Sequence, residues 1–146
     1  MDENDSILAC NERFYRAFRE ADIETMMRLW SSSDDVACIH PGWPALRGRE
    51  RVIASWRAIM LDHRPPQVEC ARVEVFRFGP LAFITCVERI PEVDTELAAT
   101  NVFRLEDGEW QILHHHSGPV RLPFDVTDLA SSSEDGPEPD PEPTLN

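Results

Sequence analysis

The stretch that decides the fold reads LAATNVFRLEDGEWQILHHHS and runs from Leu97 to Ser117. Apolar and polar side chains alternate on either side of Asp107-Gly108, a pair that favours the tight turn of a β-hairpin. Two earlier segments have the same period of two, Val68 to Phe78 and Leu81 to Ile90, and Phe78-Gly79-Pro80 joins them. We therefore predict four successive strands that pair as an antiparallel meander.

The first half of the chain has helical spacing instead. Apolar side chains recur every three or four residues in three segments, which predicts helices over about residues 6–20, 23–30 (with Asp22 as N-cap) and 48–61. A short strand, Val36 to His40, lies between the second and third helices. Helices first and strands later indicate an α+β fold with the helices packed on one face of a sheet. Apolar side chains on both sides of the last two strands predict that a second subunit covers the other face, as in a homodimer.

Length and charge limit the domain count and the partners. The 146 residues fit one domain, and the formal charge of -13 is unevenly distributed. Residues 1–122 hold 20 acidic and 14 basic side chains, whereas residues 123–146 hold 7 acidic and no basic ones. An acidic chain with dispersed arginines repels phosphate backbones, so we expect no nucleic-acid partner. The Ser- and Pro-rich end buries little apolar area, so we predict a folded domain over residues 6–120 and a disordered acidic tail over 121–146.

The cysteines and the N-terminus indicate the compartment. Cys10, Cys38, Cys70 and Cys86 are widely spaced and form no Cys-x-x-Cys pair, which is typical of reduced thiols. The chain begins with acidic residues where a secretory signal would be basic, and no apolar run approaches the length of a membrane span. We expect a cytoplasmic protein without membrane contact.

Several motifs together carry a family resemblance. These motifs are Cys38-Ile39-His40-Pro41-Gly42-Trp43, Gly48-Arg49, Ser55-Trp56, Thr85-Cys86-Val87-Glu88, Ala99-Thr100-Asn101-Val102-Phe103, Asp107-Gly108-x-Trp110 and His115-His116-Ser117-Gly118-Pro119. With them, the chain resembles the SnoaL-like branch of the nuclear transport factor two superfamily over residues 6–120. The resemblance implies a cone, in which three N-terminal helices wrap a curved antiparallel sheet as a cystatin-like roll. The superfamily includes ketosteroid isomerases, dehydratases and a kinase association domain, so it implies the fold and not the reaction.

The comparison with ketosteroid isomerases concerns three positions. Phe14 stands where those enzymes have their oxyanion-holding tyrosine, Asn101 where they have a protonated aspartic acid, and His40 where they have the aspartate base. Phe14 offers no hydrogen-bond donor to an enolate, and Tyr15, one position further on, is expected to point elsewhere from its helix. The resemblance therefore does not support ketosteroid isomerisation by the usual arrangement.

His40 and Asn101 remain the leading candidates for chemistry. An imidazole accepts a proton near neutral pH, so His40 at a pocket rim is a candidate general base; alternatively it caps a strand end. Asn101 and His116 are candidates to steady a developing oxyanion, although Asn101 equally suits a bridge between two backbone groups.

The triplet His114-His115-His116 suggests metal binding, but strand alternation limits it. His114 and His116 should share a face with Trp110 and Ile112, while His115 faces the other side. The spacing lacks the pattern of zinc sites, and half-buried histidines bonded to carbonyls explain it as well. We therefore predict no metal and no other cofactor.

The remaining candidates line the expected pocket: Phe14, Trp43, Trp56, Glu88 and His114. Trp43 follows Pro-Gly in a loop and suits a pocket wall, whereas Trp56 on its helix also suits the core. If Glu88 faces inward, burial should raise its pKa and make it an alternative base; an ion pair with Arg104 is the plainer interpretation.

Two functions follow from this sequence. The first is a pocket domain that binds a small apolar carbonyl compound, with isomerase or hydro-lyase chemistry that uses histidine as a general base. The alternative is a non-catalytic homodimeric association module, in which the sheet face with Leu113 and His115 packs against a partner. Metal-assisted hydrolysis would need an organised histidine cluster.

Overall fold

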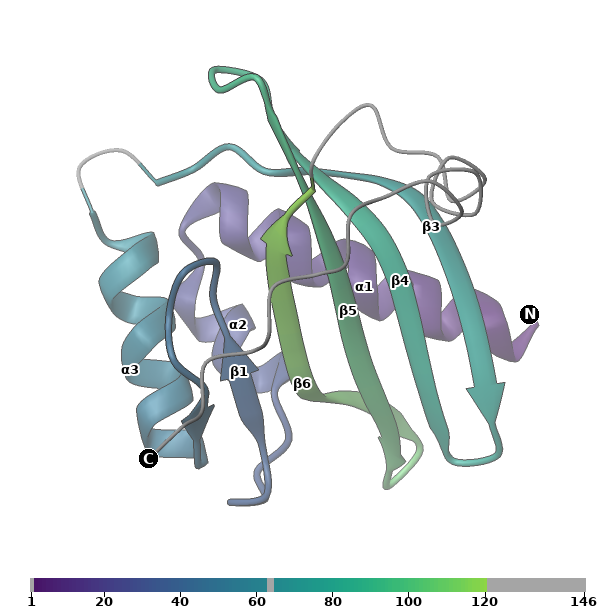
Figure 1. Ribbon diagram of the computed structural model, residues 1–146. Coiled ribbons are helices and arrows are strands. Elements are labelled where there is room, and N and C mark those ends of the chain that lie inside the picture. The colour runs from purple at the N-terminus through teal and green to yellow at the C-terminus, as the bar shows by residue number, and fades with distance from the viewer. Residues whose placement is uncertain (1, 63–64, 121–146) are drawn as a thin grey trace, which may run out of the picture.

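The computed structural model describes residues 2–62 and 65–120, which form three helices against one curved sheet (Figure 1). The helices are α1 (Glu3–Glu20), α2 (Ile23–Leu29) and α3 (Arg49–Met60). The strands are β1 (Ala37–Ile39), β2 (Leu46–Arg47), β3 (Glu69–Phe78), β4 (Leu81–Ile90), β5 (Thr95–Glu106) and β6 (Glu109–Pro119). The predicted α+β cone, with its helices first and its strand meander last, is confirmed.

The sheet has the strand order β2-β1-β6-β5-β4-β3. Strands β3 to β6 pair with their sequence neighbours in antiparallel fashion, as the alternation predicted. Strand β1 instead runs parallel to β6, so the expectation of a wholly antiparallel sheet is wrong at this pair. The long path from β1 through α3 and the meander returns the chain in the same direction, which parallel pairing requires. The two-residue strand β2 was not predicted because it is too short to show a period.

Two irregularities bend the sheet around α1 (Figure 1). In β3 the register shifts between Ala71 and Glu74, where Arg72 has a φ of 52°. In β6 it shifts at Leu113, because Val102 pairs with His114 and Phe103 pairs with Ile112. Such bulges insert an extra residue and increase local twist, which curves the sheet into one side of the cone.

The core lies between the helices and the inward face of the sheet. Its largest fully buried side chains include Phe14, Trp30, Trp56 and Phe103. Asp22 caps α2, as predicted, and accepts hydrogen bonds from the Thr25 backbone N–H at 3.1 Å and the Thr25 hydroxyl at 2.7 Å. None of the helices described combines the length and hydropathy that a bilayer crossing requires. The predicted tail lies outside the described residues.

Candidate functional site

The inward face of the sheet carries polar side chains where an apolar core would be expected. They come from α1, β4, β5 and β6, and each is 3% exposed or less. Burial of so many polar groups is stable only when they bond one another. We call them the polar cluster: Asn11, Tyr15, Glu88, Asn101, His115 and Ser117.

Asn101 lies at the centre of the polar cluster. Its amide nitrogen donates to Asn11 Oδ1 at 2.8 Å and to the Tyr15 hydroxyl at 3.1 Å. Its amide oxygen lies 2.6 Å from His115 Nδ1. The two donations fix the orientation of the amide, and its oxygen can only accept, so His115 carries its proton on Nδ1. The His115 Nε2 atom is therefore left with a free lone pair.

That lone pair faces the carboxyl group of Glu88. Glu88 accepts a hydrogen bond from the Tyr15 hydroxyl at 2.8 Å on Oε2 and another from the Ser117 hydroxyl on Oε1. His115 Nε2 lies 3.8 Å from Glu88 Oε2, which is longer than a direct hydrogen bond but close enough for strong electrostatic coupling. A single added proton is thus attracted by two neighbouring basic atoms.

Burial alters the proton affinity of these groups in opposite directions. It raises the pKa of Glu88, although the hydrogen bonds from Ser117 and Tyr15 oppose that rise. Burial, aided by the charges of His40, His114 and His116, lowers the pKa of His115 to about 3. At neutral pH His115 is uncharged, while Glu88 holds a proton more readily than an exposed glutamate.

Burial also keeps Tyr15 in its donor form. Its pKa lies well above the ordinary value, first because of burial and then because of the neighbouring Glu88 charge. The Tyr15 hydroxyl therefore keeps its proton and continues to donate to Glu88.

His40 follows β1 and lies near the polar cluster. Ser55 donates its one hydroxyl hydrogen to the Val52 carbonyl at 2.6 Å, so it accepts the 2.8 Å hydrogen bond from His40 Nε2. His40 Nδ1 is then unprotonated and lies 3.9 Å from the Cys38 sulfur. Burial lowers the pKa of His40 to about 4.

Aromatic rings connect His40 with both the surface and the interior. Its ring centroid lies 5.0 Å from that of Trp43, which is 42% exposed, and 6.3 Å from that of His115. Trp56, wholly buried, contacts His40 at 4.7 Å and His115 at 5.5 Å between ring centroids. The sequence His40, Trp56, His115 thus leads from the Trp43 loop to the polar cluster.

A family model described as SnoaL-like domain matches residues 7–121. The chain belongs to this family. The resemblance to the nuclear transport factor two superfamily that the motifs carry is therefore confirmed.

Solved structures agree with the assignment to the SnoaL-like family. A putative dehydratase from the NTF2-like family of Streptomyces avermitilis is 35% identical, with a TM-score of 0.75 over 80% of this chain and 95% of that one. A putative calcium/calmodulin-dependent protein kinase type II association domain from Thiobacillus denitrificans is 30% identical, with a TM-score of 0.68 over 77% and 94% of the two chains.

A curated relative is longer than this SnoaL-like domain. The F-box protein SKIP8 of Arabidopsis thaliana is 29% identical over 117 residues, which are 80% of this chain and 51% of that protein. The chain therefore spans about half the length of the curated relative that it matches.

The structure separates the predicted site residues of this SnoaL-like domain into two groups. His40, Asn101 and Glu88 face inward, and Phe14 and Trp56 are buried beside them. Trp43 lies at the rim of this region, against His40.

His114 and His116 lie on the other face of the sheet, so the expectation that one of them shares a concavity with His40 is wrong. His114 bonds the Ala37 carbonyl at 2.9 Å, and His116 is exposed. The physical reason is the bulge at Leu113. It reverses the alternation, so Trp110 and Ile112 face inward before it and His115 and Ser117 face inward after it. The proposed partner-facing role of His115 is overturned for the same reason, because His115 is 2% exposed inside the cone.

Sequence reasoning missed three members of the polar cluster, namely Asn11, Tyr15 and Ser117. Tyr15 does not point elsewhere: it is 1% exposed and contacts both Asn101 and Glu88. Both neighbours are buried, because Tyr15 bonds Glu88 on the sheet while Phe14 packs between Trp56 of α3 and His115 of β6. The four-residue spacing of Asn11 and Tyr15 was the available signal, since it places both polar groups on one face of the helix.

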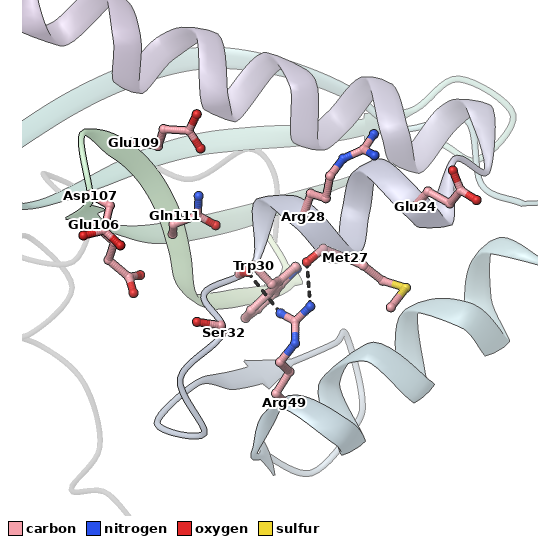
Figure 2. Close-up of a pocket in the computed structure, with 10 residues that line it drawn as sticks. All are labelled: Glu24, Met27, Arg28, Trp30, Ser32, Arg49, Glu106, Asp107, Glu109 and Gln111. Atoms are coloured by element: carbon pink, nitrogen blue, oxygen red, sulfur yellow. Dashed lines mark hydrogen bonds between the residues drawn. The ribbon is translucent and has the colours of Figure 1, made fainter.

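The structure also has a cleft of about 520 Å³ away from the predicted site (Figure 2). Arg49 lies at its base and donates to the carbonyls of Met27, Trp30 and Ser31, which closes the C-terminal end of α2. Figure 2 shows acidic side chains of the β5–β6 turn, including Glu106 and Glu109, along the opposite wall. Its lining does not suit the apolar ligand expected from the sequence. Within residues 2–62 and 65–120, no group of three or more His, Cys, Asp or Glu side chains is arranged to hold a metal ion.

Proposed function

We propose that this chain binds a small apolar carbonyl compound inside its cone and transfers protons on it, as an isomerase or a hydro-lyase. The observation that carries the proposal is the buried pair of Glu88 and His115, with 3.8 Å between Oε2 and Nε2. Burial of an ionised carboxyl group costs roughly several kcal/mol of folding free energy unless hydrogen bonds or an opposite charge offset the lost hydration. Titratable groups whose proton affinities are pushed apart in this way concentrate at functional sites.

Glu88 is the better proton carrier of the two. Its raised pKa brings it closer to neutral pH, where a general acid or base acts best. In an isomerase, Glu88 would take the proton from the carbon next to the carbonyl group and return it to another carbon. In a hydro-lyase, Glu88 would take the same proton and then give it to the departing hydroxyl, which leaves as water.

Of the other candidate residues, Asn101 would position the Glu88–His115 pair and His40 would lie where a ligand enters. Both amide hydrogens of Asn101 are given to Asn11 and Tyr15, so Asn101 positions the pair instead of holding a substrate oxygen. His40 lies between the exposed Trp43 and the interior, and a swing of the Trp43 ring would uncover it. His116, on the outer face, has no part in this chemistry. The name of the 35% identical relative, a putative dehydratase, supports the hydro-lyase version.

A ligand and turnover screen tests the proposal. The purified chain is mixed with β-hydroxy ketones, β,γ-unsaturated ketones and steroid-like ketones, and both melting temperature and ultraviolet absorbance of the conjugated product are followed. We expect at least one compound to stabilise the protein and be converted. Glu88→Gln should abolish conversion, whereas His116→Ala, on the outer face, should preserve it. If no ketone in the panel stabilises or is converted by a folded protein, the catalytic proposal is wrong.

A homodimeric association module is the second candidate. The polar cluster is closed from solvent and internally hydrogen-bonded, as a purely structural network would be. The outer face of the sheet carries the stacked rings of Phe76 and Phe83, with centroids 4.7 Å apart. The putative kinase association domain at 30% identity supports this function. A stable dimer that binds none of the ketones would favour it.

A further inference from the structure

Two cysteine side chains of neighbouring strands lie beside the polar cluster. Cys70 of β3 pairs with Glu88 of β4, and Cys86 precedes Glu88 by two residues. Residues two apart on a strand share a face, so Cys70 and Cys86 are diagonal neighbours on the inward side of adjacent strands. The β3 bulge begins directly after Ala71, next to this pair.

Both sulfur atoms contact residues of the polar cluster. The Asn11 amide donates to Cys70 Sγ at 3.7 Å, and Cys86 Sγ lies 3.3 Å from the Tyr15 hydroxyl oxygen. The hydrogen of the Cys86 thiol is directed to Cys70, because hydrogen bonding between these two side chains raises the pKa of Cys86 and lowers that of Cys70. Cys86 is thus held as a thiol, whereas Cys70 accepts hydrogen bonds from Cys86 and Asn11 that stabilise a thiolate.

Only one of the two thiols is accessible. Cys70 is partly exposed and lines a cleft of about 350 Å³ between α1 and β3, together with Arg19, Glu12 and Val73. Cys86 is 5% exposed and lies behind it. A small oxidant that enters the cleft therefore meets Cys70 first.

Hydrogen bonds and charges around the two sulfurs also make Cys70 the more readily ionised thiol of the two. The pKa of Cys70 is lowered by hydrogen bonding with Cys86, then by the Asn11 amide and the Arg19 charge, against the effects of burial and Glu88. The pKa of Cys86 is raised by its hydrogen bond with Cys70 and by burial. A thiolate is the reactive form of cysteine, so Cys70 is the nucleophile of the pair.

We propose that Cys70 and Cys86 form a peroxide-oxidisable pair that closes to an intramolecular disulfide. The Cys70 thiolate attacks one oxygen of hydrogen peroxide, the O–O bond breaks, and the hydroxide released takes a proton to become water. The resulting sulfenic acid is attacked by Cys86 sulfur; the S–O bond breaks and the Cys86 proton leaves with the hydroxide as a second water. The two sulfurs lose two electrons in total, and the peroxide gains them. The proposal goes beyond the proposed function and does not depend on it.

The chain provides its own control thiols. Cys10 and Cys38 are both 0% exposed. Burial raises the pKa of Cys10 to about 11 and also raises that of Cys38. Neither should react at peroxide concentrations that oxidise Cys70.

Peptide mapping tests the pair directly, because cleavage after arginine separates all four cysteines. Cys10 falls in peptide 1–13, Cys38 in 29–47, Cys70 in 58–72 and Cys86 in 78–89, since Arg64 precedes proline and is not cut. The reduced full chain is treated with hydrogen peroxide at low molar excess. We expect an intact-mass loss of about 2 Da and a disulfide between peptides 58–72 and 78–89.

Two variants assign the order of events. Cys86→Ser should stop at a sulfenic acid on peptide 58–72, which dimedone traps, and Cys70→Ser should show neither product. Near-ultraviolet circular dichroism checks that each variant is folded, and if one is not, the wild-type peptide map decides alone. Linkage through Cys10 or Cys38, over-oxidation of Cys70 with Cys86 left free, or no reaction of the wild type would each overturn the proposal.

Discussion

Asn101 of β5 lies directly opposite His115 of β6, and His115 Nδ1 donates a hydrogen bond to Asn101 Oδ1 over 2.6 Å. The same Asn101 side chain bonds Asn11 and Tyr15 on α1. One amide group therefore joins the helix to the sheet and fixes which nitrogen of His115 carries the proton. That assignment leaves His115 Nε2 facing Glu88, on which the proposed chemistry depends.

Replacement of Asn101 by alanine should destabilise the fold. It removes the donor to Asn11 Oδ1 and to the Tyr15 oxygen and the acceptor of the His115 Nδ1 proton, and each buried polar atom left unpaired costs about 1 to 3 kcal/mol. We expect the free energy of unfolding to fall by about 2 to 4 kcal/mol in urea titrations, since partial relaxation recovers some bonds. Thr100→Ala, one residue away on the outer face, is the matched control and should change stability little. Equal effects of the two substitutions would show that the network adds nothing.

Deletion of Leu113 should leave the histidines on their present faces. Leu113 is the residue without a partner in β5, and its neighbours already alternate, with Ile112 inward opposite Phe103 and His114 outward opposite Val102. We expect the deletion variant to unfold cooperatively, measured by circular dichroism on heating, but at a lower temperature, because the local twist that curves the sheet is reduced. Leu113→Ala keeps the bulge and should lower the transition temperature less. Loss of cooperative unfolding in the deletion variant would contradict the register assigned to β6.

This bulge also explains which parts of the site the sequence could predict. Strands β4 and β5 pair without a shift, so their alternation is unbroken and Glu88 and Asn101 lie on the inward face that the pocket hypothesis required. Beyond Leu113 the same rule failed, since a bulge depends on how β6 pairs with β5 and leaves no clear local pattern. The alternation rule therefore assigned His114, His115 and His116 each to the wrong face of the sheet.

Tyr15 was missed for a different reason. Neighbouring residues on a helix point about 100° apart, and for a helix on a flat sheet only one of Phe14 and Tyr15 would be expected to face it. Here the sheet covers Tyr15, and Trp56 of α3 together with His115 covers Phe14, so both are buried. Helix positions and lengths could be read from periodicity, but the width of the covered face is a property of the assembled cone.

The outer face of the sheet supports a prediction on oligomeric state. We expect light scattering to give a mass near twice the chain's 16.7 kDa, because the sheet face with Phe83 and Val102 would pack against a second copy. Val102→Arg should shift the protein toward the monomer, since a charge would be buried at the interface. Leu61→Arg is the control, because Leu61 is 64% exposed at the end of α3. A wild-type monomer at micromolar concentration would refute the dimer.

The two buried histidines predict how stability depends on pH. His40 and His115 have pKa values lowered to about 4 and about 3 in the folded chain, while an unfolded histidine titrates near 6.5. Between these values the unfolded state binds more protons, so the stability contributed by keeping each histidine neutral is present above pH 6.5 and lost as pH falls toward 4. Each histidine should account for about 2 kcal/mol of unfolding free energy between pH 7 and pH 5. Glu88 acts in the opposite direction, since its raised pKa means that the folded state binds more protons.

The change in stability with pH, and not the absolute stability, separates these contributions. His40→Gln and His115→Gln should each flatten the dependence of unfolding free energy on pH between 7 and 5 by about 2 kcal/mol, measured in urea titrations at several pH values. Glu88→Gln should steepen it, because the opposing group is gone. His116→Gln removes an exposed imidazole from the outer face and controls for the loss of a histidine as such. If His40→Gln and His115→Gln leave the slope of the wild type unchanged, the histidines are not held neutral by burial, and the electrostatic basis of the Glu88–His115 pair is lost with them.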